Sequence, residues 1–286
     1  MASHLDLRPS SIAGQWYSAD PRSLAASVDR YIDSAALPEL DGRLVGIMTP
    51  HAGHSYSGPV AGYAFAAIRN LTPDVVAVLS PMHYWTEYPL LTTAYQAYAT
   101  PLGALPLDTE GMAALNACLH GELGFGLTPI KNDPEHSLEI ELPFLQRALK
   151  HKFHLLPIMV RDVSPHLTRA LGDCLAKALQ GRNALLVAST DLSHFYPQEV
   201  AEVLDKAMLR RVEALDPEGV LQVEDDGKGF ACGRGALAAV LWAARELGAD
   251  SARILHHATS GDVTGDYKQV VGYAAAVFTQ KARPSP

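Results

Sequence analysis

Six short and nearly continuous apolar runs constrain the fold of this chain more than any other feature. They are Arg43–Met48, Val75–Leu79, Phe153–Val160, Ala184–Ala188, Ala252–His256 and Val270–Thr279. Apolar runs of this length are typical of β-strands that are covered on both faces. The sequence therefore predicts a central sheet that lies between two other layers.

Stretches with helical spacing separate these strands. The first covers Asp20–Ala36, where Leu24, Val28 and Ile32 recur four residues apart. Asp20 is a favourable N-cap residue, and Pro21 suits the first turn. Further helices are predicted at Pro59–Asn70, Thr109–Cys118, Leu138–Lys150, Ser164–Gln180, Gln198–Ala214 and Gly235–Leu247. This alternation predicts an α/β fold with a largely parallel or mixed central sheet and helices on both faces.

No repeat, low-complexity tract or flexible linker divides the chain. Residues 1–286 are therefore expected to form one domain, with an ordered core from about residue 10 to 280 and a disordered tail, KARPSP. The net charge of -8 opposes nucleic-acid binding and disfavours densely anionic substrates. No apolar run is long enough to span a membrane, and the first residues lack signal-peptide features, so we expect a cytoplasmic protein without a membrane partner.

Three cysteines are too few, and too odd in number, for a disulfide framework. Cys118 and Cys174 lie at apolar helical positions, which predicts buried, unreactive thiols. Cys232 lies between glycine-rich neighbours at a predicted helix start, beside Arg234. A helix N-terminus and a nearby cation would lower the pKa of its thiol.

Histidines follow three of the predicted strands. His51 comes after the first strand, His83 after the second and His194 after the fourth. In α/β folds the carboxyl ends of parallel strands carry ligand sites, so the three loops converge if the strands are neighbours. A single histidine at a strand end is usually a hydrogen-bonded loop residue, but three in equivalent positions favour a shared site.

Other polar residues lie near these histidines in the sequence. Asp191 comes three residues before His194. His136 opens a predicted helix in an acidic segment, where it either holds the loop and caps the helix or faces the site. His54 shares the glycine-rich loop of His51 and faces either the pocket or solvent.

Imidazoles together with a thiolate form a donor set for zinc, iron or copper, whereas calcium and magnesium prefer oxygen ligands. A second interpretation needs no metal: Cys232 is a nucleophile, His51, His83 or His194 is its base, and Asp191 orients the imidazole. Metal content separates these two interpretations. No Walker loop, GxGxxG or GxSxG motif is present to indicate nucleotide binding or a serine hydrolase.

Seven segments, in order along the chain, resemble the Memo family. This family is named mediator of ErbB2-driven cell motility in animals and AmmeMemoRadiSam system protein B in microbes. The segments are AGQWYSAD (13–20), PHAGHSYSG (50–58), SPMH (80–83), EHSLEIELPF (135–144), STDLSH (189–194), ACGRG (231–235) and GYAAAVF (272–278). The resemblance covers nearly the whole chain.

The resemblance implies a fold similar to the class III extradiol dioxygenases of the LigB type, which bind non-haem Fe(II). It implies that His51, His83 and Cys232 are metal ligands, and that Asp191 and His194 line the pocket. Fe(II) is the expected metal, with copper or zinc as alternatives. The dioxygenases use two histidines and a carboxylate, so a thiolate in the third position departs from their pattern and favours softer metals.

The function that this resemblance implies is a metal-dependent oxidoreductase acting on a small aromatic or related molecule. His194 would be the general acid and base, oriented or charge-tuned by Asp191. His136 also matches the family, and His54 and Arg234 are further pocket candidates. The alternative is a non-catalytic protein that binds iron, copper or a partner. Microbial relatives imply a pathway shared with a radical S-adenosylmethionine protein and an AMMECR-type protein.

Overall fold

The computed structural model describes residues 5–281, so the predicted disordered tail lies outside the described residues after Lys281. The described strands of the main sheet are, in spatial order, β10 (His194–Tyr196), β12 (Val270–Gln280), β2 (Arg43–Thr49), β9 (Ala184–Ser189), β3 (Val75–Pro81), β8 (His154–Val160), β4 (Leu90–Thr93) and β7 (Thr128–Ile130). Strand β11 (Ser251–Thr259) pairs with β12 outside this path. A smaller sheet contains β1 (Leu7–Arg8), β5 (Ala97–Thr100) and β6 (Gly103–Pro106).

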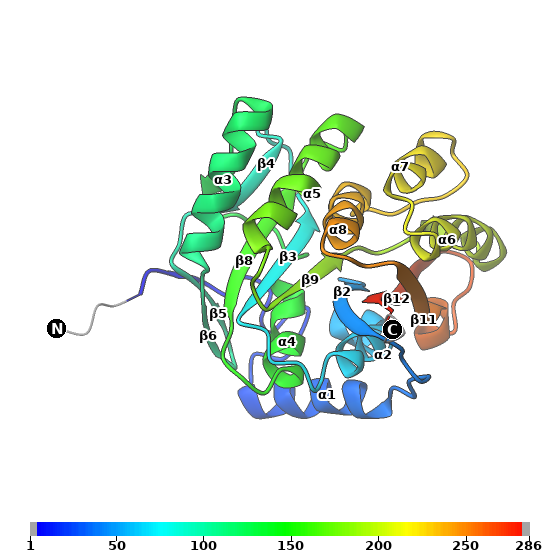
Figure 1. Ribbon diagram of the computed structural model, residues 1–286. Helices are drawn as coiled ribbons and strands as arrows, with labels where there is room; N and C mark the ends of the chain where they lie inside the picture. The colour runs from blue at the N-terminus through cyan, green and yellow to red at the C-terminus, as the bar shows by residue number, and fades with distance from the viewer. Residues whose placement is uncertain (1–4, 282–286) are drawn as a thin grey trace, which may run out of the picture.

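Helices cover both faces of the main sheet (Figure 1). They are α1 (Pro21–Ser34), α2 (His54–Ala67), α3 (Thr109–Leu123), α4 (Leu142–Ala148), α5 (Pro165–Leu179), α6 (Gln198–Glu213), α7 (Pro217–Asp225), α8 (Arg234–Glu246) and the short α9 (Gly261–Thr264), with a 3₁₀ turn, η1, at Glu139–Glu141. One face carries α3, α5 and α8 with α6 and α7, and the other carries α1, α2 and α4.

The sheet is mixed, as the sequence predicts. Strands β2, β9, β3 and β8 are parallel neighbours, whereas β12 runs antiparallel to β2 and β4 runs antiparallel to β8. Together with the helices on both faces, this arrangement confirms the predicted α/β fold.

Strand β3 shows why the apolar runs are continuous. Val75, Ala77 and Leu79 belong to the core on one face of the sheet, and Val76 and Val78 belong to the core on the other. Successive side chains of a strand point to opposite faces, so a strand covered on both sides needs apolar residues throughout. Burial of each valine or leucine side chain contributes about 1.5–3 kcal/mol.

The predicted helix starts are right at α1 and wrong at α2. Asp20 caps α1, since its Oδ1 accepts a hydrogen bond from the Ser23 N–H at 2.8 Å. Helix α2 begins at His54, not at the predicted Pro59, which lies inside the helix. The extra turn is held by burial of His54 and Ser57, which no local periodicity signals.

The prediction that Cys118 and Cys174 are separate thiols is wrong, because the two residues form a disulfide. Helix α3 packs against α5 and brings the two Cα atoms to 5.5 Å, a distance that a disulfide spans. Cys232 is the free cysteine of the described residues. Within residues 5–281, no helix combines the length and apolarity needed to cross a membrane.

Candidate metal centre

The neighbouring order β2–β9–β3 brings the ends of three strands to one edge of the sheet. His51 and His83 each lie two residues beyond their strands, and their ring centroids are 5.2 Å apart. His136 enters from the loop before η1, with its ring 5.5 Å from His51 and 5.0 Å from His83. One ligand atom from each of these three histidines lies within 4.8 Å of the other two. The structure therefore gathers three imidazoles where the family resemblance implies two and a thiol.

Cys232 lies next to this group, with its Sγ 3.1 Å from Nε2 of His51. The Asp191 N–H donates a hydrogen bond to the same Sγ at 3.3 Å. Burial, reinforced by the Asp191 carboxyl, raises the pKa of the thiol well above its usual value. The sequence-based expectation of a lowered pKa is therefore wrong, and the metal-free nucleophile interpretation loses its main support.

Arg234 does not offset this burial. Its guanidinium pairs with Asp225 at 2.6 Å and with Glu224 at 3.5 Å, on helix α7. Cys232 does precede the N-terminus of α8, but the cation that was expected to stabilise a thiolate is committed to two carboxylates. A bound metal would have to displace the thiol proton before Cys232 could coordinate it.

The hydrogen bonds around Ser189 determine which nitrogen of His51 is free. The Ser189 hydroxyl lies 2.7 Å from the carbonyl oxygen of Ser137, 2.8 Å from Oε1 of Glu141 and 2.9 Å from Nδ1 of His51. A hydroxyl has one proton to donate, and the Ser137 carbonyl can only accept it. Burial raises the pKa of Glu141 well above its ordinary value, which favours the protonated carboxyl, and in that form Glu141 donates to Ser189.

The remaining contact of Ser189 must then be a bond donated by the Nδ1–H of His51. This tautomer leaves a lone pair on Nε2, the nitrogen that faces Cys232. Burial lowers the pKa of His51 well below its ordinary value, further lowered by His83 and His136, so the ring is neutral. A neutral, pre-oriented imidazole of this kind is what a transition metal requires.

Glu135 fixes the hydrogen bond at Nδ1 of His83, as Ser189 does at Nδ1 of His51. The His83 N–H donates to Oε2 of Glu135 at 2.6 Å, and Nδ1 of His83 lies 2.9 Å from Oε1. Nδ1 of His136 is 3.4 Å from the same Oε1. Burial would raise the pKa of Glu135, but the bonds from His83 and from the Ser137 N–H outweigh it and hold that pKa far below its usual range. The carboxylate therefore stays ionised and fixes Nδ1 of His83 as its donor.

His136 is neutral as well, because burial lowers the pKa of its ring to about 4. The Trp16 ring covers it at a centroid distance of 4.1 Å. His51 and His136, both neutral, and His83 thus form a set of nitrogen donors with a sulfur donor beside them. This set fits zinc, iron or copper, and not the oxygen-seeking calcium and magnesium.

Asp191 and His194 lie close to the cluster, but Asp191 does not orient His194. Oδ1 of Asp191 accepts the N–H of His51 at 2.7 Å, and burial raises the pKa of Asp191 to about 7. His194 is oriented by a backbone group, the carbonyl of Leu192, 2.7 Å from its Nδ1. The expectation that Asp191 orients His194 is therefore corrected: Asp191 fixes the backbone that carries His51.

His54 points into the core and not toward solvent. It is 4% exposed, its Nε2 lies 3.0 Å from the Ile140 carbonyl, and its ring packs on Phe144 and Tyr17. Nδ1 of His54 has no hydrogen-bond partner among the described residues. Burial lowers the pKa of His54 to about 4.

The segment that carries Glu135 and His136 is fastened by a buried arginine from the N-terminal strand β1. Arg8 donates to Oδ1 of Asp133 at 2.7 Å, to the Glu135 carbonyl at 2.7 Å and to Oε2 of Glu139 at 2.6 Å. Sequence analysis missed Arg8, Glu135, Glu141 and Ser189. The acidic segment around His136 was the available signal for the two glutamates, because buried carboxyl groups need hydrogen-bond or charge partners.

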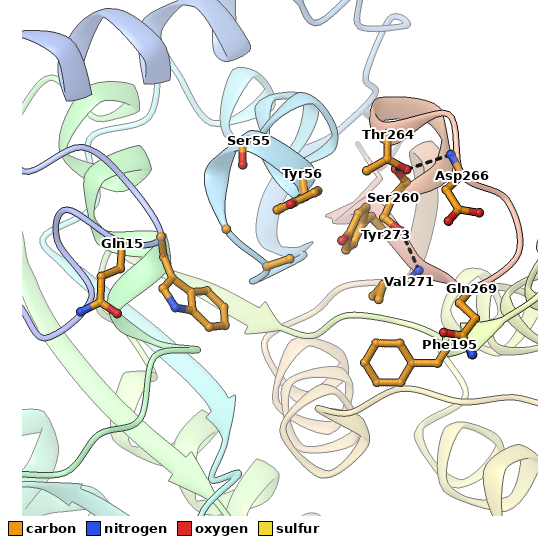
Figure 2. A pocket seen from close by; sticks show the side chains of 13 residues that line it. Gln15, Ser55, Tyr56, Phe195, Ser260, Thr264, Asp266, Gln269, Val271 and Tyr273 are labelled. Atoms are coloured by element: carbon orange, nitrogen blue, oxygen red, sulfur yellow. Dashed lines mark hydrogen bonds between the residues drawn. The ribbon is translucent and has the colours of Figure 1, made fainter.

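A cavity of about 560 Å³ opens beside the cluster (Figure 2). Trp16 lines it and also covers His136, while Ala52 and Gly53 follow His51. Phe195, the residue after His194, also lines the cavity (Figure 2). A cavity of this volume is in the range that holds a small-molecule ligand.

Comparisons with known proteins agree on one family. A family model described as "Memo-like protein" matches residues 8–277. A MEMO1 family protein of Methanopyrus kandleri is 36% identical over 282 residues, covering 95% of this chain and 98% of the relative. A MEMO1 family protein of Nitrosopumilus maritimus is 33% identical over 276 residues, covering 95% and 99%.

A solved structure of an uncharacterized Escherichia coli K12 protein aligns with a TM-score of 0.46 and 13% identity, over 82% of this chain and 100% of that one. A likeness at this level has no bearing on function.

Proposed function

Because this chain belongs to the Memo-like protein family, we propose that it binds a divalent transition metal, Fe(II) in the first instance, and acts as an oxidoreductase on a small aromatic molecule. The observation that carries the proposal is the group of three imidazole donors within 4.8 Å of one another. Its support is chemical: the rings are held by hydrogen bonds, and burial keeps His51 and His136 neutral.

His51 and His83 are ligands in this proposal whatever the third donor is. Cys232 supplies the third donor according to the resemblance, and its Sγ lies 3.1 Å from Nε2 of His51. His136 completes the group of mutually close donor atoms in the structure. Variants at these two positions identify the third ligand.

When bound, the metal supplies Lewis-acid and electron-transfer chemistry at the coordination positions that the protein leaves open. His194 supplies the proton transfer: its Nδ1–H donates to the Leu192 carbonyl, so Nε2 carries a lone pair that accepts a proton. Burial lowers the pKa of His194, which keeps the ring neutral and able to act as a base near neutral pH. Asp191, with a pKa of about 7, is a second group that exchanges a proton in this range.

Metal content after anaerobic loading tests the metal site. Protein stripped with a chelator, reloaded with Fe(II) and desalted should retain about one iron per chain. His51→Ala and His83→Ala should each lower the affinity at least 10-fold, by about the size of effect that loss of an oriented ligand produces. His166→Ala, at an exposed position of α5, is the matched control and should load normally. Normal loading of both ligand variants would refute the site.

The third ligand is identified in the same assay. If Cys232 coordinates, Cys232→Ala lowers iron retention and His136→Ala does so less; if His136 coordinates, the order reverses. With Co(II) as the probe, sulfur coordination also adds an intense near-ultraviolet charge-transfer band that histidine coordination lacks. Both readouts are independent of catalysis.

Oxygen consumption by the iron-loaded protein tests the activity, with a panel of catechols as substrates and His83→Ala as the inactive control. Uptake that depends on iron and on His83 supports an oxidoreductase. One observation favours a second function, metal binding without ring cleavage: a thiol stands beside His51 where the dioxygenases use a carboxylate. Stoichiometric metal with no uptake for any catechol would favour that function.

A further inference from the structure

The cavity beside the metal cluster is walled by aromatic side chains. Trp16, Tyr56, Phe195 and Tyr273 line it, and Figure 2 shows that Phe195 comes from a different segment than Tyr56 and Tyr273. Trp16 links the cavity to the cluster through its contact with His136, and Phe195 is joined to His194 in the chain with their ring centroids 5.7 Å apart. Aromatic walls of this kind hold a planar ring by stacking and edge contacts.

The backbone conformation of Phe195 indicates that its side chain occupies a specific position in the cavity wall. It is the residue at the irregularity between His194 and Tyr196, where the pairing of β10 with β12 shifts register. Its φ is 63°, in the left-handed region that a bulky residue enters at a cost of about 1–3 kcal/mol. Its side chain is 68% exposed, so burial in the protein does not offset that cost. A ligand in the cavity would cover the ring, and bulges are a common way to aim a side chain at a site.

The charge of the cavity indicates the kind of ring it takes. Among the lining residues Asp266 carries the charge, and no lysine or arginine is among them. The Lys268 N–H donates to Oδ1 of Asp266 at 3.0 Å, but the carboxylate forms no ion pair with any residue between 5 and 281. A carboxylate without an ion-pair partner, in a cavity that aromatic side chains also line, attracts an ammonium group through ion pairing and cation–π contact and repels a carboxylate ligand.

We infer that this cavity binds a small aromatic amine, with the ring held by Trp16 and Phe195 and the ammonium group directed to Asp266. The inference rests on the proposed function in one respect, since it names the substrate class that the metal site would act on. Binding itself needs no metal, so it is testable without one.

Two probes with opposite charge test the inference: tyramine and 4-hydroxyphenylacetate, which share a phenol ring and a two-carbon side chain and end in an ammonium group and a carboxylate. Binding is measured by titration calorimetry and by tryptophan fluorescence, on the full chain kept metal-free with a chelator. Tyramine should bind about 10-fold more tightly than the acid, the ratio that about 1.4 kcal/mol of charge preference gives. Asp266→Asn should remove most of this preference, and Phe195→Ala should weaken the binding of both probes.

Asp262→Asn is the matched control, because Asp262 is on α9 nearby but does not line the cavity. Equal affinity for the two probes, tighter binding of the acid, or an unchanged preference in Asp266→Asn would overturn the inference. Absence of tyramine binding at millimolar concentration would overturn it too, and normal Fe(II) loading of the same protein would then leave the metal site standing. Tyramine binding in protein that fails to load iron would support the cavity and refute the metal site.

Discussion

The protonated state of Glu141 is the least expected feature of the site, and it leads to a sharp prediction. Glu141 is 1% exposed, its Oε1 lies 2.8 Å from Ser189 Oγ, and its Oε2 accepts the Thr49 hydroxyl at 3.3 Å. Glutamine reproduces both bonds, with its amide donating to Ser189 and its carbonyl accepting from Thr49. We therefore expect Glu141→Gln to fold normally and to bind metal as the wild type does.

The two proteins should differ in how stability depends on pH. The pKa of Glu141 is raised in the folded state, so the wild-type proton is retained on folding but released on unfolding above pH 4.5. The stability associated with this proton is complete below the unfolded pKa and is lost as pH rises toward the folded pKa. While the pH stays below the folded pKa, the loss amounts to about 1.4 kcal/mol per pH unit, which is at most about 2 kcal/mol between pH 5.0 and 6.5. Glu141→Gln has no such proton and does not lose this stability.

Urea unfolding at pH 5.0, 5.75 and 6.5, with chelator present, measures the difference. The free energy of unfolding of Glu141→Gln minus that of the wild type should rise by up to about 2 kcal/mol across the series. Asp191 and the buried histidines titrate in both proteins, so their effects cancel. Glu213→Gln, at an exposed position of α6, controls for the loss of a carboxyl group as such. A constant difference across the series would show that Glu141 is ionised in the folded state and accepts a hydrogen bond from Ser189.

Three further predictions concern stability. Arg8→Met leaves two buried carboxylates without their cation and should lower the free energy of unfolding by about 3–5 kcal/mol. The surface variant Arg22→Ala is the control and should change it by less than about 0.5 kcal/mol. Equal effects of the two variants in urea unfolding would argue against the buried network. The Cys118–Cys174 disulfide closes a loop with a sequence separation of 56. Its reduction should lower the free energy of unfolding by about 4 kcal/mol. A melting temperature that reductant leaves unchanged would contradict this prediction. His54→Gln should make the protein more resistant to acid, because the pKa of His54 falls on folding from 6.5 to about 4. The stability that neutral His54 contributes is complete above pH 6.5, and about 3 kcal/mol of it is lost as the pH drops to 4. Parallel curves of stability against pH for the variant and the wild type would contradict this prediction.

The fold was predictable from local pattern to a considerable extent. The six apolar runs all correspond to strands of the main sheet. Strands buried on both faces must be apolar at every position, which explains the runs in the central strands, whereas β11 is only partly buried. The strands β1, β4, β5, β6, β7 and β10 were not predicted, since they are two to four residues long and carry little periodic signal. The single-domain organisation stays a prediction.

The site was predictable in its location and less so in its chemistry. His51 and His83 were identified by their place after parallel strands, a property that the sequence displays directly. His136 was noticed, but its place among the donors depends on the position of its loop. Arg8 holds this loop through a bond to Glu139, which is 131 residues away in the sequence. No local pattern carries a contact of that separation.

The sequence by itself determined the α/β class, the edge of the sheet where histidines gather, and the family. Each of these follows from residue order, either through the period of apolar residues or through motifs. The tertiary structure alone decided the Cys118–Cys174 disulfide, the raised pKa of Cys232 and the proton on Glu141. These depend on burial and on partners brought together by folding, because the free energy of a charge or a thiol is set by its surroundings in space.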